Sequence, residues 1–266
     1  MKRLFLSLLL VSLMGCDGED GTRSSGPEPT TSPTQVASPS PSPPPLVTAP
    51  PSPTLASACP NEIAVRSDES LRNGGSVKGD VDGDGTHEEV WAVVDDEGGP
   101  GCVGFLVVRR ADDSLLSTAL PFETLFGTFD PRVHALVDLG PLAGYEISAF
   151  VGRGASTEFL ALYAVSGDTV VQLKINRRPE PERSVFGTYG SVGHLSAIDC
   201  VEGHLVVSTA VPSGESVEYR VKRLGYELQG LVLARTGPPQ RDRVDADELS
   251  GYPEFVSSPL GSCPQA

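Results

Sequence analysis

Acidic side chains are concentrated in one short stretch of the sequence, residues 79–90, which reads GDVDGDGTHEEV. Hard cations such as calcium take about six to eight oxygen ligands, and alternate residues of a tight loop can direct their oxygens to one centre. Carboxylates held within about 5 Å of one another raise each other's pKa unless a cation offsets their charge. The stretch therefore predicts a calcium site built from its acids, which are Asp80, Asp82, Asp84, Glu88 and Glu89.

The spacing of these acids suits a loop shorter than an EF-hand. With Asp80 as position one, the bidentate acid of an EF-hand would fall at position twelve, which is Trp91 in an expected strand. Closure must therefore come earlier, from Glu88, with Thr86 contributing its backbone carbonyl. Glu89 is a competitor for the closing contact. The alternative to a metal site is an Asp-Gly turn whose carboxylates are solvated.

The same residues resemble the calcium loop of FG-GAP repeats, also called VCBS-type repeats, of integrin-type propellers and many bacterial surface proteins. The resemblance implies a calcium ion that braces the loop and takes no part in catalysis. Carried over by position, it implies side-chain ligands at Asp80, Asp82 and Asp84, a carbonyl ligand at Thr86 and a closing acid at Glu88. The family prefers Asp at the last of these positions.

Short β-type segments fill the chain from residue 59 to residue 266. They include EVWAVV, GFLVVRR, EISAFVG, FLALYAV and HLVVSTAV, and turn-forming Gly, Asp, Pro and Ser residues separate them. No stretch keeps helical periodicity for about twelve residues. We therefore expect residues 59–266 to form one all-β domain that positions the acidic loop between two strands.

Three parts of this domain look like one repeated unit of about 60 residues. Asp80, Asp138 and Asp199 each precede a strand and are 58 and 61 positions apart. About four strands per unit is typical of propeller blades. We expect antiparallel blade-like repeats in a propeller-like or partial-propeller arrangement, with ring closure left open. Only the first unit keeps enough acids for a metal site, because the later units retain little more than Asp138, Asp199 and Glu202.

Four cysteines lie in the expected domain, and their even number in an exported protein favours two disulfides. Three connectivities are allowed. Pairing Cys59 with Cys102 and Cys200 with Cys263 closes the shorter loops, which is the only ground for preferring it. No two of these cysteines have the Cys-x-x-Cys spacing of a metal site.

The N-terminus has the features of an export signal. A basic start at Lys2 and Arg3 precedes the apolar run LFLSLLLVSL, which is about half the length of a membrane span. The following LMGC resembles the lipobox of bacterial lipoproteins, which implies a signal peptide at residues 1–15 and a lipidated Cys16. The alternative is an ordinary secretory peptide with an unmodified thiol.

Residues 16–58 consist mainly of Pro, Ser and Thr and contain few large apolar side chains. Such a composition cannot bury a core, so we expect a lipidated cysteine followed by a disordered linker. Pro-rich linkers are semi-rigid and extended. The expected location is therefore the extracytoplasmic face of the cell membrane, with attachment through the lipid alone.

Charge and motifs narrow the function classes. The formal net charge of −15 argues against nucleic acid and against anionic lipid surfaces as partners. The folded part has no Gly-x-Ser-x-Gly or His-Glu-x-x-His motif, and its four histidines are scattered. We expect a non-enzymatic lipoprotein that binds or scaffolds envelope or extracellular proteins or glycans. The alternatives are an envelope hydrolase with a site built from distant residues, and a structural accessory of an envelope machine.

Overall fold

The computed structural model describes residues 59, 61–99, 101–121, 127–175, 184–191, 193–214 and 218–266, without the side chain of Ser191. The predicted signal peptide, lipidated cysteine and linker lie outside the described residues. All described residues belong to one compact unit, Pro53–Ala266. Because this unit holds its own apolar cores and both disulfides, it has what a domain needs to fold independently.

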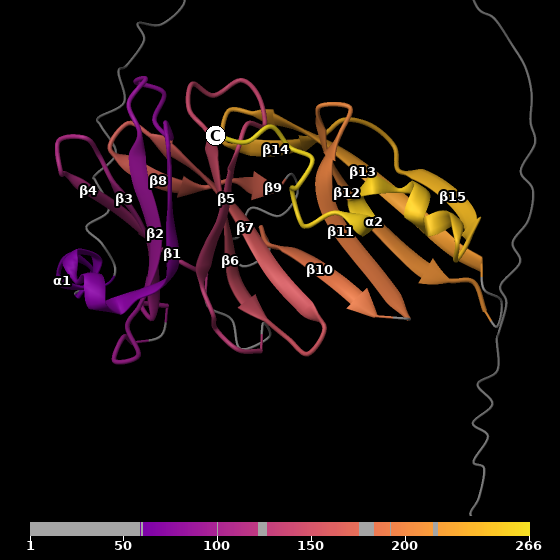
Figure 1. Cartoon of the computed structure of the whole chain (residues 1–266), viewed down its shortest axis with the longest axis horizontal. Coiled ribbons are helices and arrows are strands. Elements are labelled where there is room, and N and C mark those ends of the chain that lie inside the picture. The colour runs from indigo at the N-terminus through magenta and orange to yellow at the C-terminus, as the bar shows by residue number, and fades with distance from the viewer. Residues whose placement is uncertain are drawn as a thin grey trace, which may run out of the picture. The chain divides into compact units, whose positions relative to one another are not determined.

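The first sheet follows a short helical entry. Helix α1 spans Glu62–Ser67, and a 3-10 turn, η1, spans Glu69–Leu71. Four antiparallel strands then pair in chain order (Figure 1). These strands are β1 (Arg72–Gly79), β2 (Glu88–Val94), β3 (Gly104–Arg109) and β4 (Leu115–Ala119).

The second sheet contains the remaining strands, and its only described parallel pairing joins β9 to β14. It begins with four strands that form an antiparallel meander. They are β5 (Arg132–Val137), β6 (Glu146–Arg153), β7 (Thr157–Ser166) and β8 (Thr169–Gln172). Strands β9 (Lys174–Ile175) and β10 (Phe186–Ser191) follow. The last meander has β11 (His194–Val201), β12 (His204–Pro212), β13 (Glu218–Gln229) and β14 (Val232–Arg235). Strand β15 (Gln240–Asp245), the 3-10 turn η4 (Glu248–Gly251) and helix α2 (Pro253–Val256) complete the order.

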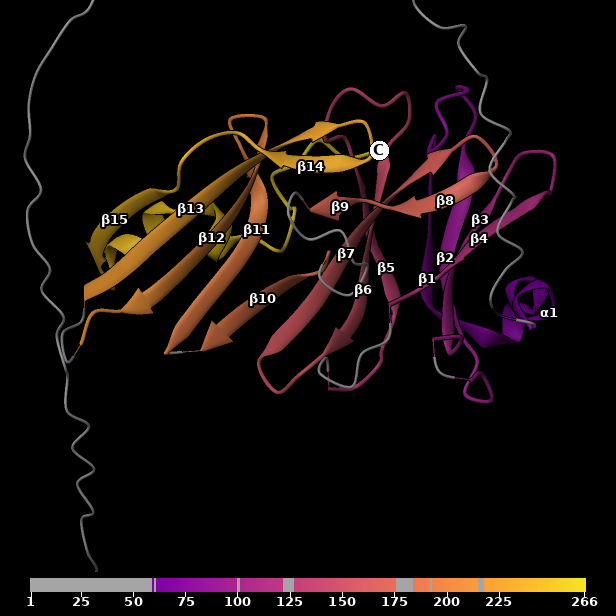
Figure 2. The ribbon, with the colours of Figure 1, turned by 180° about the vertical axis from the view of Figure 1, so that it is seen from behind.

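The predicted all-β, antiparallel architecture is confirmed. Among the described strands, β1–β4, β5–β8 and β11–β14 are three four-stranded antiparallel meanders. Strand β10 pairs with both β7 and β11, so it joins the second and third meanders into one sheet. The described strands do not close into a ring (Figures 1 and 2).

The second meander lies between the other two (Figure 1). Apolar side chains fill both of its faces. One face packs on the first sheet through residues that include Ile147, Ala149 and Tyr163. The other packs on the third meander through residues that include Phe150 and Leu162. Burial of apolar surface contributes about 25 cal/mol per Å², so these two cores hold the three meanders together.

Both disulfide pairings favoured by loop length are confirmed. Cys59 is bonded to Cys102, which ties the segment before α1 to the start of the β3 hairpin. Cys200 at the end of β11 is bonded to Cys263 in the C-terminal tail, residues 257–266. In the described part of the chain, no helix combines the length and the apolar character needed to cross a membrane.

The C-terminal tail contacts all three meanders. The Leu260 amide donates to the Ile198 carbonyl on β11 at 2.9 Å. The Pro264 carbonyl accepts from the amide of Asp138, directly after β5, at 2.9 Å. Ala266 packs so close to Gly79 on β1 that a Cβ at Gly79 would lie 2.8 Å from the Ala266 side chain. The tail therefore connects the three meanders to one another.

Candidate metal centre

The acidic loop connects β1 to β2 and gathers three of the five predicted ligands. Asp80, Asp82 and Glu88 each place a carboxylate oxygen within 4.8 Å of the other two. Glu88 begins β2 and is only 1% exposed, whereas the two aspartates are half-buried. Sequence spacing thus identified a cluster that the fold does assemble.

The carboxylates also shape the backbone of the loop. Asp80 accepts hydrogen bonds from the amides of Gly83 at 2.7 Å and Gly85 at 2.9 Å. Both glycines have positive φ, +80° and +88°, a conformation that glycine adopts without steric cost. Glu88 closes the loop by accepting from the Val81 amide at 2.9 Å. The loop is therefore curled around its own acids.

Asp84 is not part of the three-carboxylate group. It is exposed, and its carboxylate accepts from both the amide and the hydroxyl of Thr86, at 2.7 and 2.5 Å. These two bonds hold the pKa of Asp84 below its usual value. The Thr86 hydroxyl also lies 3.2 Å from Glu88 Oε1. Asp84 and Thr86 therefore form a turn at the tip of the loop.

Glu89 does not compete with Glu88 for the closing position. Its carboxylate accepts from the Ser76 hydroxyl at 2.8 Å and pairs with Arg72 at 3.2 Å. The hydrogen bond from Ser76, followed by the charges of Arg72 and Arg109, lowers the pKa of Glu89. Adjacent residues of a strand point to opposite faces, which separates Glu89 from Glu88.

One cation approaches the cluster from its edge. The Nε atom of Arg110 lies 3.1 Å from Asp82 Oδ2, and its Nη1 donates to Asp168 at 2.7 Å. The hydrogen bond to Asp168, together with the nearby Asp82 charge, raises the pKa of Arg110. One guanidinium against three carboxylates leaves the cluster negative. An all-oxygen, net-negative donor set fits a hard cation such as calcium.

The second meander contains a matching loop without the central acids. Asp138 and Glu146 lie 58 positions after Asp80 and Glu88, and the Leu139 amide donates to Glu146 at 2.8 Å as Val81 does to Glu88. Gly140 and Leu142 stand where the first loop has Asp82 and Asp84. The two loops are structurally equivalent, but the second offers too few carboxylates for a metal site.

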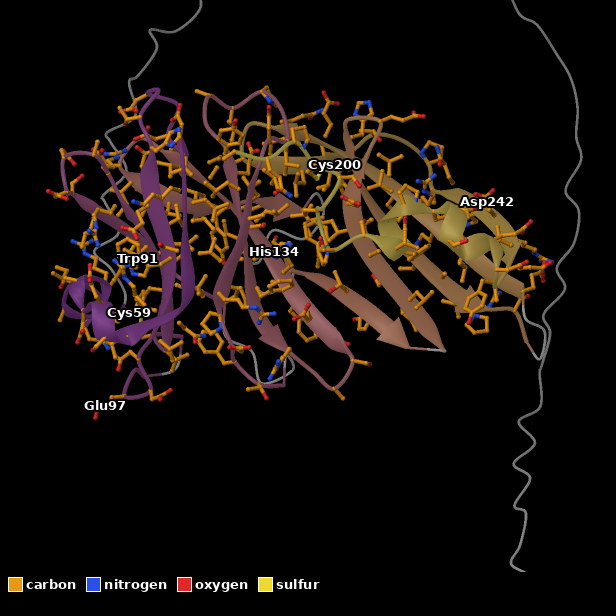
Figure 3. The ribbon with its side chains drawn as sticks, in the orientation of Figure 1. Cys59, Trp91, Glu97, His134, Cys200 and Asp242 are labelled. Atoms are coloured by element: carbon orange, nitrogen blue, oxygen red, sulfur yellow. A yellow bond between two sulfur atoms is a disulfide. The ribbon has the colours of Figure 1, made fainter. Side chains whose placement is uncertain are left out.

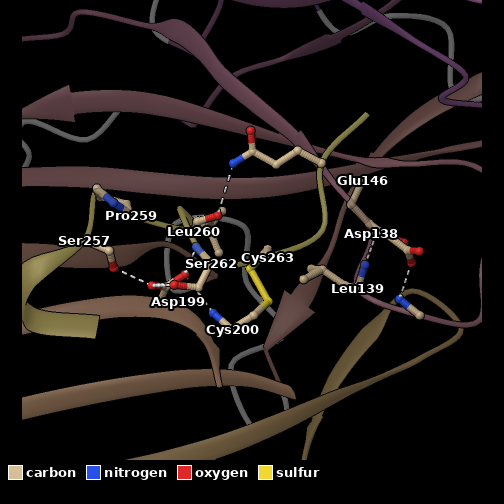
Figure 4. Close-up of a disulfide and its surroundings, with 12 residues drawn as sticks. Asp138, Leu139, Glu146, Asp199, Cys200, Ser257, Pro259, Leu260, Ser262 and Cys263 are labelled. Carbon is tan, nitrogen blue, oxygen red and sulfur yellow. Dashed lines mark hydrogen bonds between the residues drawn. A yellow bond between two sulfur atoms is a disulfide. The ribbon is translucent and has the colours of Figure 1, made fainter. Parts of the chain in front are cut away.

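Glu146 is the buried carboxyl of this second loop, and its pKa shows the effect of burial. Its side chain is fully buried, and its Oε1 atom has no hydrogen-bond partner among the described residues (Figure 4). Burial raises the pKa of Glu146 to about 7, and the charge of Asp138 adds to this effect. The carboxyl is therefore about half protonated near pH 7 instead of fully ionised.

The two loops pack directly against each other. The Tyr145 amide donates to the Asp80 carbonyl at 2.9 Å. A Cβ at Gly83 would lie 2.6 Å from the backbone carbon of Ala143, and one at Gly144 would lie 2.5 Å from that of Val81. These glycines allow the backbones to approach, so the second loop buttresses the candidate metal loop.

Gly83→Ala is therefore expected to destabilise the domain by about 2 to 4 kcal/mol, because it adds a backbone clash to the cost of positive φ. Gly85→Ala is the matched control. Gly85 has a similar φ but no heavy atom within 4 Å of an added Cβ, so its cost should be about 1 kcal/mol. Urea unfolding measures both, and equal losses would argue against the loop-to-loop contact.

Asp199, on strand β11, has a structural role. Its buried carboxylate accepts from the amides of Cys200 at 2.9 Å and Ser262 at 2.7 Å, and from the hydroxyls of Ser262 and Ser257 (Figure 4). Glu202 lies in the exposed turn after β11. Asp199 thus fastens the tail to β11, a contact that sequence spacing could not reveal.

The histidines do not gather into a metal site. His134 packs on Phe150, and its Nε2 atom lies 2.7 Å from the Pro259 carbonyl, near the centre of the molecule in Figure 3. His194 makes an edge contact with Tyr189. Across the described residues, the cluster of Asp80, Asp82 and Glu88 is the one group of three or more metal-ligating side chains.

Comparisons with known proteins add no assignment. No protein-family model matches the chain, and no curated protein or solved structure is significantly similar to it.

Proposed function

We propose that the chain is a lipid-anchored extracytoplasmic protein whose β domain binds calcium and serves to bind or scaffold other envelope or extracellular molecules. The observation that carries the metal assignment is the convergence of Asp80, Asp82 and Glu88 within 4.8 Å. The proposal gives the ion a structural role and gives the domain no catalytic one.

The chain's own residues suggest what a bound ion would do. Asp80 follows the last residue of β1, and Glu88 is the first residue of β2, so the cluster spans the two ends of the connection. A calcium ion supplies positive charge that offsets the mutual repulsion of the carboxylates. The loop carries the contacts to the second meander, so bracing it would also brace the junction between the first two meanders.

The equivalent loop of the second meander supports this proposal by contrast. There the central aspartates are replaced, and the remaining buried carboxyl, Glu146, has a pKa raised to about 7. This buried carboxyl is thus about half protonated near pH 7. In the first loop, three acids are clustered and Arg110 lies beside one of them, an arrangement that a bound cation would stabilise.

The extracytoplasmic location is supported by two independent features. LMGC at residues 13–16 follows a short apolar run, as in lipoprotein signals. Both disulfides lie in the domain, and such bonds persist mainly in oxidising compartments. Together they favour an exported, tethered domain.

Calcium is expected to raise the thermal midpoint of residues 53–266 by about 5 to 10 °C when millimolar calcium replaces EDTA, because the ion binds only the folded loop. The Asp82→Asn and Glu88→Gln variants should lose this increase. Differential scanning calorimetry measures the midpoint, and titration calorimetry gives the stoichiometry, expected to be one ion.

Two further variants sharpen this test. Asp247→Asn removes an exposed carboxylate directly before η4 and should keep the full increase. Asp84→Asn reports whether the outward-facing acid takes part, and the geometry predicts a smaller loss than for Asp82→Asn. An unchanged wild-type midpoint, or a shift that survives in Asp82→Asn and Glu88→Gln, would refute the metal assignment.

A further inference from the structure

Four exposed cations, called the cation ladder below, lie on the adjacent strands β13 and β15. The antiparallel register sets Arg220 opposite Arg243 and Lys222 opposite Arg241. Residues two apart on a strand share a face, so the four cations occupy one face as two directly opposed pairs. This face is turned to the viewer in Figure 2, with η4 and α2 behind the strands.

The ladder cations are not neutralised by the described acids around them. None of the four forms an ion pair among the described residues. Asp242, between the two β15 arginines, faces the other side and accepts from the Tyr252 hydroxyl at 3.3 Å. Figure 3 labels Asp242 at the end of the molecule opposite Cys59.

Other charged residues define the limits of the ladder. Glu218 and Asp245 oppose each other in the next register position, so acids bound the ladder at one end. Arg223 belongs to the opposite face, where its Nε lies 2.8 Å from the buried Glu254. The ladder is thus a confined basic area on a chain with a formal charge of −15.

Strand stability does not explain this arrangement. Like charges placed directly opposite each other destabilise a sheet. Charged residues on an edge strand prevent pairing with other molecules, which accounts for Arg241 and Arg243 on β15. Strand β13 is paired on both sides, with β12 and β15, so Arg220 and Lys222 have no such role. An anionic partner bound along this face would offset the repulsion between the opposed cations, because each cation would then be attracted to the partner.

We propose that the cation ladder is the docking surface for a linear polymer that carries phosphate groups. Three of its four cations are arginines, whose planar guanidinium groups match phosphate oxygens in pairs. The cations are spaced about 5 Å across the strands and about 7 Å along them. A single flexible chain can follow this pattern while avoiding the acids elsewhere on the domain.

The surroundings disfavour two other phosphate-bearing partners. An anionic bilayer presents a broad surface, which the negative charge of the whole chain would repel. Proteins that bind single-stranded nucleic acid combine a basic groove with aromatic side chains on which bases stack. Beside the ladder on β12 the neighbours are Thr209 and Val211, which offer no such platform. The proposal names a partner class for the binding function proposed above, but it uses none of the calcium-loop residues.

Long-chain inorganic polyphosphate is the probe, and fluorescence anisotropy with residues 53–266 at low ionic strength is the measurement. Wild-type protein should bind, and its affinity should fall steeply as salt is added. Replacing all four ladder cations by glutamine should weaken binding at least tenfold. The matched control carries glutamine at four other exposed cations, Lys78, Arg153, Lys174 and Arg235, and should bind within threefold of wild type.

A second variant guards against effects of the edge strand. Arg220→Gln with Lys222→Gln leaves the charges of β15 intact and should still weaken binding several-fold. Both variants should unfold at or above the wild-type temperature, since they relieve opposed like charges. Equal losses in ladder and control variants, equal affinity for polyglutamate, or preferred binding to phosphatidylglycerol vesicles would each overturn the proposal. A failed calcium test would leave this result untouched.

Discussion

Replacing Cys200 and Cys263 together by alanine is expected to lower the free energy of unfolding by about 4 kcal/mol. The bond closes a loop with a sequence separation of 63, and cross-links over loops of this length remove about that much chain entropy from the unfolded state. The loss should be larger than for most single changes because the bond also secures the tail against β11. Urea unfolding of residues 53–266 at neutral pH measures it.

The Cys59–Cys102 bond provides the control for this prediction. Its separation of 43 gives nearly the same entropic contribution, but it secures only the segment before α1. Loss of the Cys200–Cys263 bond should in addition expose the amides of Asp138 and Leu260 to hydrogen exchange, because both bond to the tail or lie within it. If the free energy of unfolding fell by less than about 1 kcal/mol and those amides stayed protected, the tail would not be what holds the three meanders together.

Glu146→Gln is expected to stabilise the domain at pH 8 and to change it little at pH 4. The folded pKa of Glu146 is raised from 4.5 to about 7, so the folded state keeps this proton while the unfolded state releases it. The resulting penalty is absent below pH 4.5, grows as pH rises to about 7 and is then constant at about 3 kcal/mol. Glutamine removes the titration and the penalty with it.

Urea unfolding of wild type and variant at pH 4 and pH 8 tests this, and the difference between the two proteins is the quantity to compare. Glu227→Gln, which removes an exposed carboxyl from β13, is the control and should show almost no pH-dependent difference. If Glu146→Gln shifted stability equally at both pH values, the pKa of Glu146 in the folded state would not be raised above that in the unfolded state.

Local sequence patterns were sufficient to predict the strands, the disulfides and the three clustered acids of the loop. The β-type segments alternate with turn residues, and the shorter-loop pairing of cysteines is the one that the fold adopts. Asp80 and Glu88 are near each other because antiparallel strands β1 and β2 bring the two ends of their connection together. Spacing along the chain carries that information.

Contacts between distant segments could not be predicted in the same way. Asp84 faces outward because the amide and hydroxyl of Thr86 satisfy its carboxylate locally. Arg110 reaches Asp82 from the end of β3, and the serines that satisfy Asp199 lie about 60 residues further along the chain. The cation ladder likewise depends on the pairing of β13 with β15 across an intervening strand in the sequence. To predict any of these contacts, one must know which strands pair and in which register.

The tail at residues 257–266 also sets the order in which the domain can assemble. It follows every strand of the domain in the sequence, yet it contacts β1, β5 and β11. Contacts between segments far apart in the sequence form late and slow the search for the native state. A domain that lacks residues 257–266 should therefore be incompletely folded and sensitive to proteases, and addition of these residues should complete its native form.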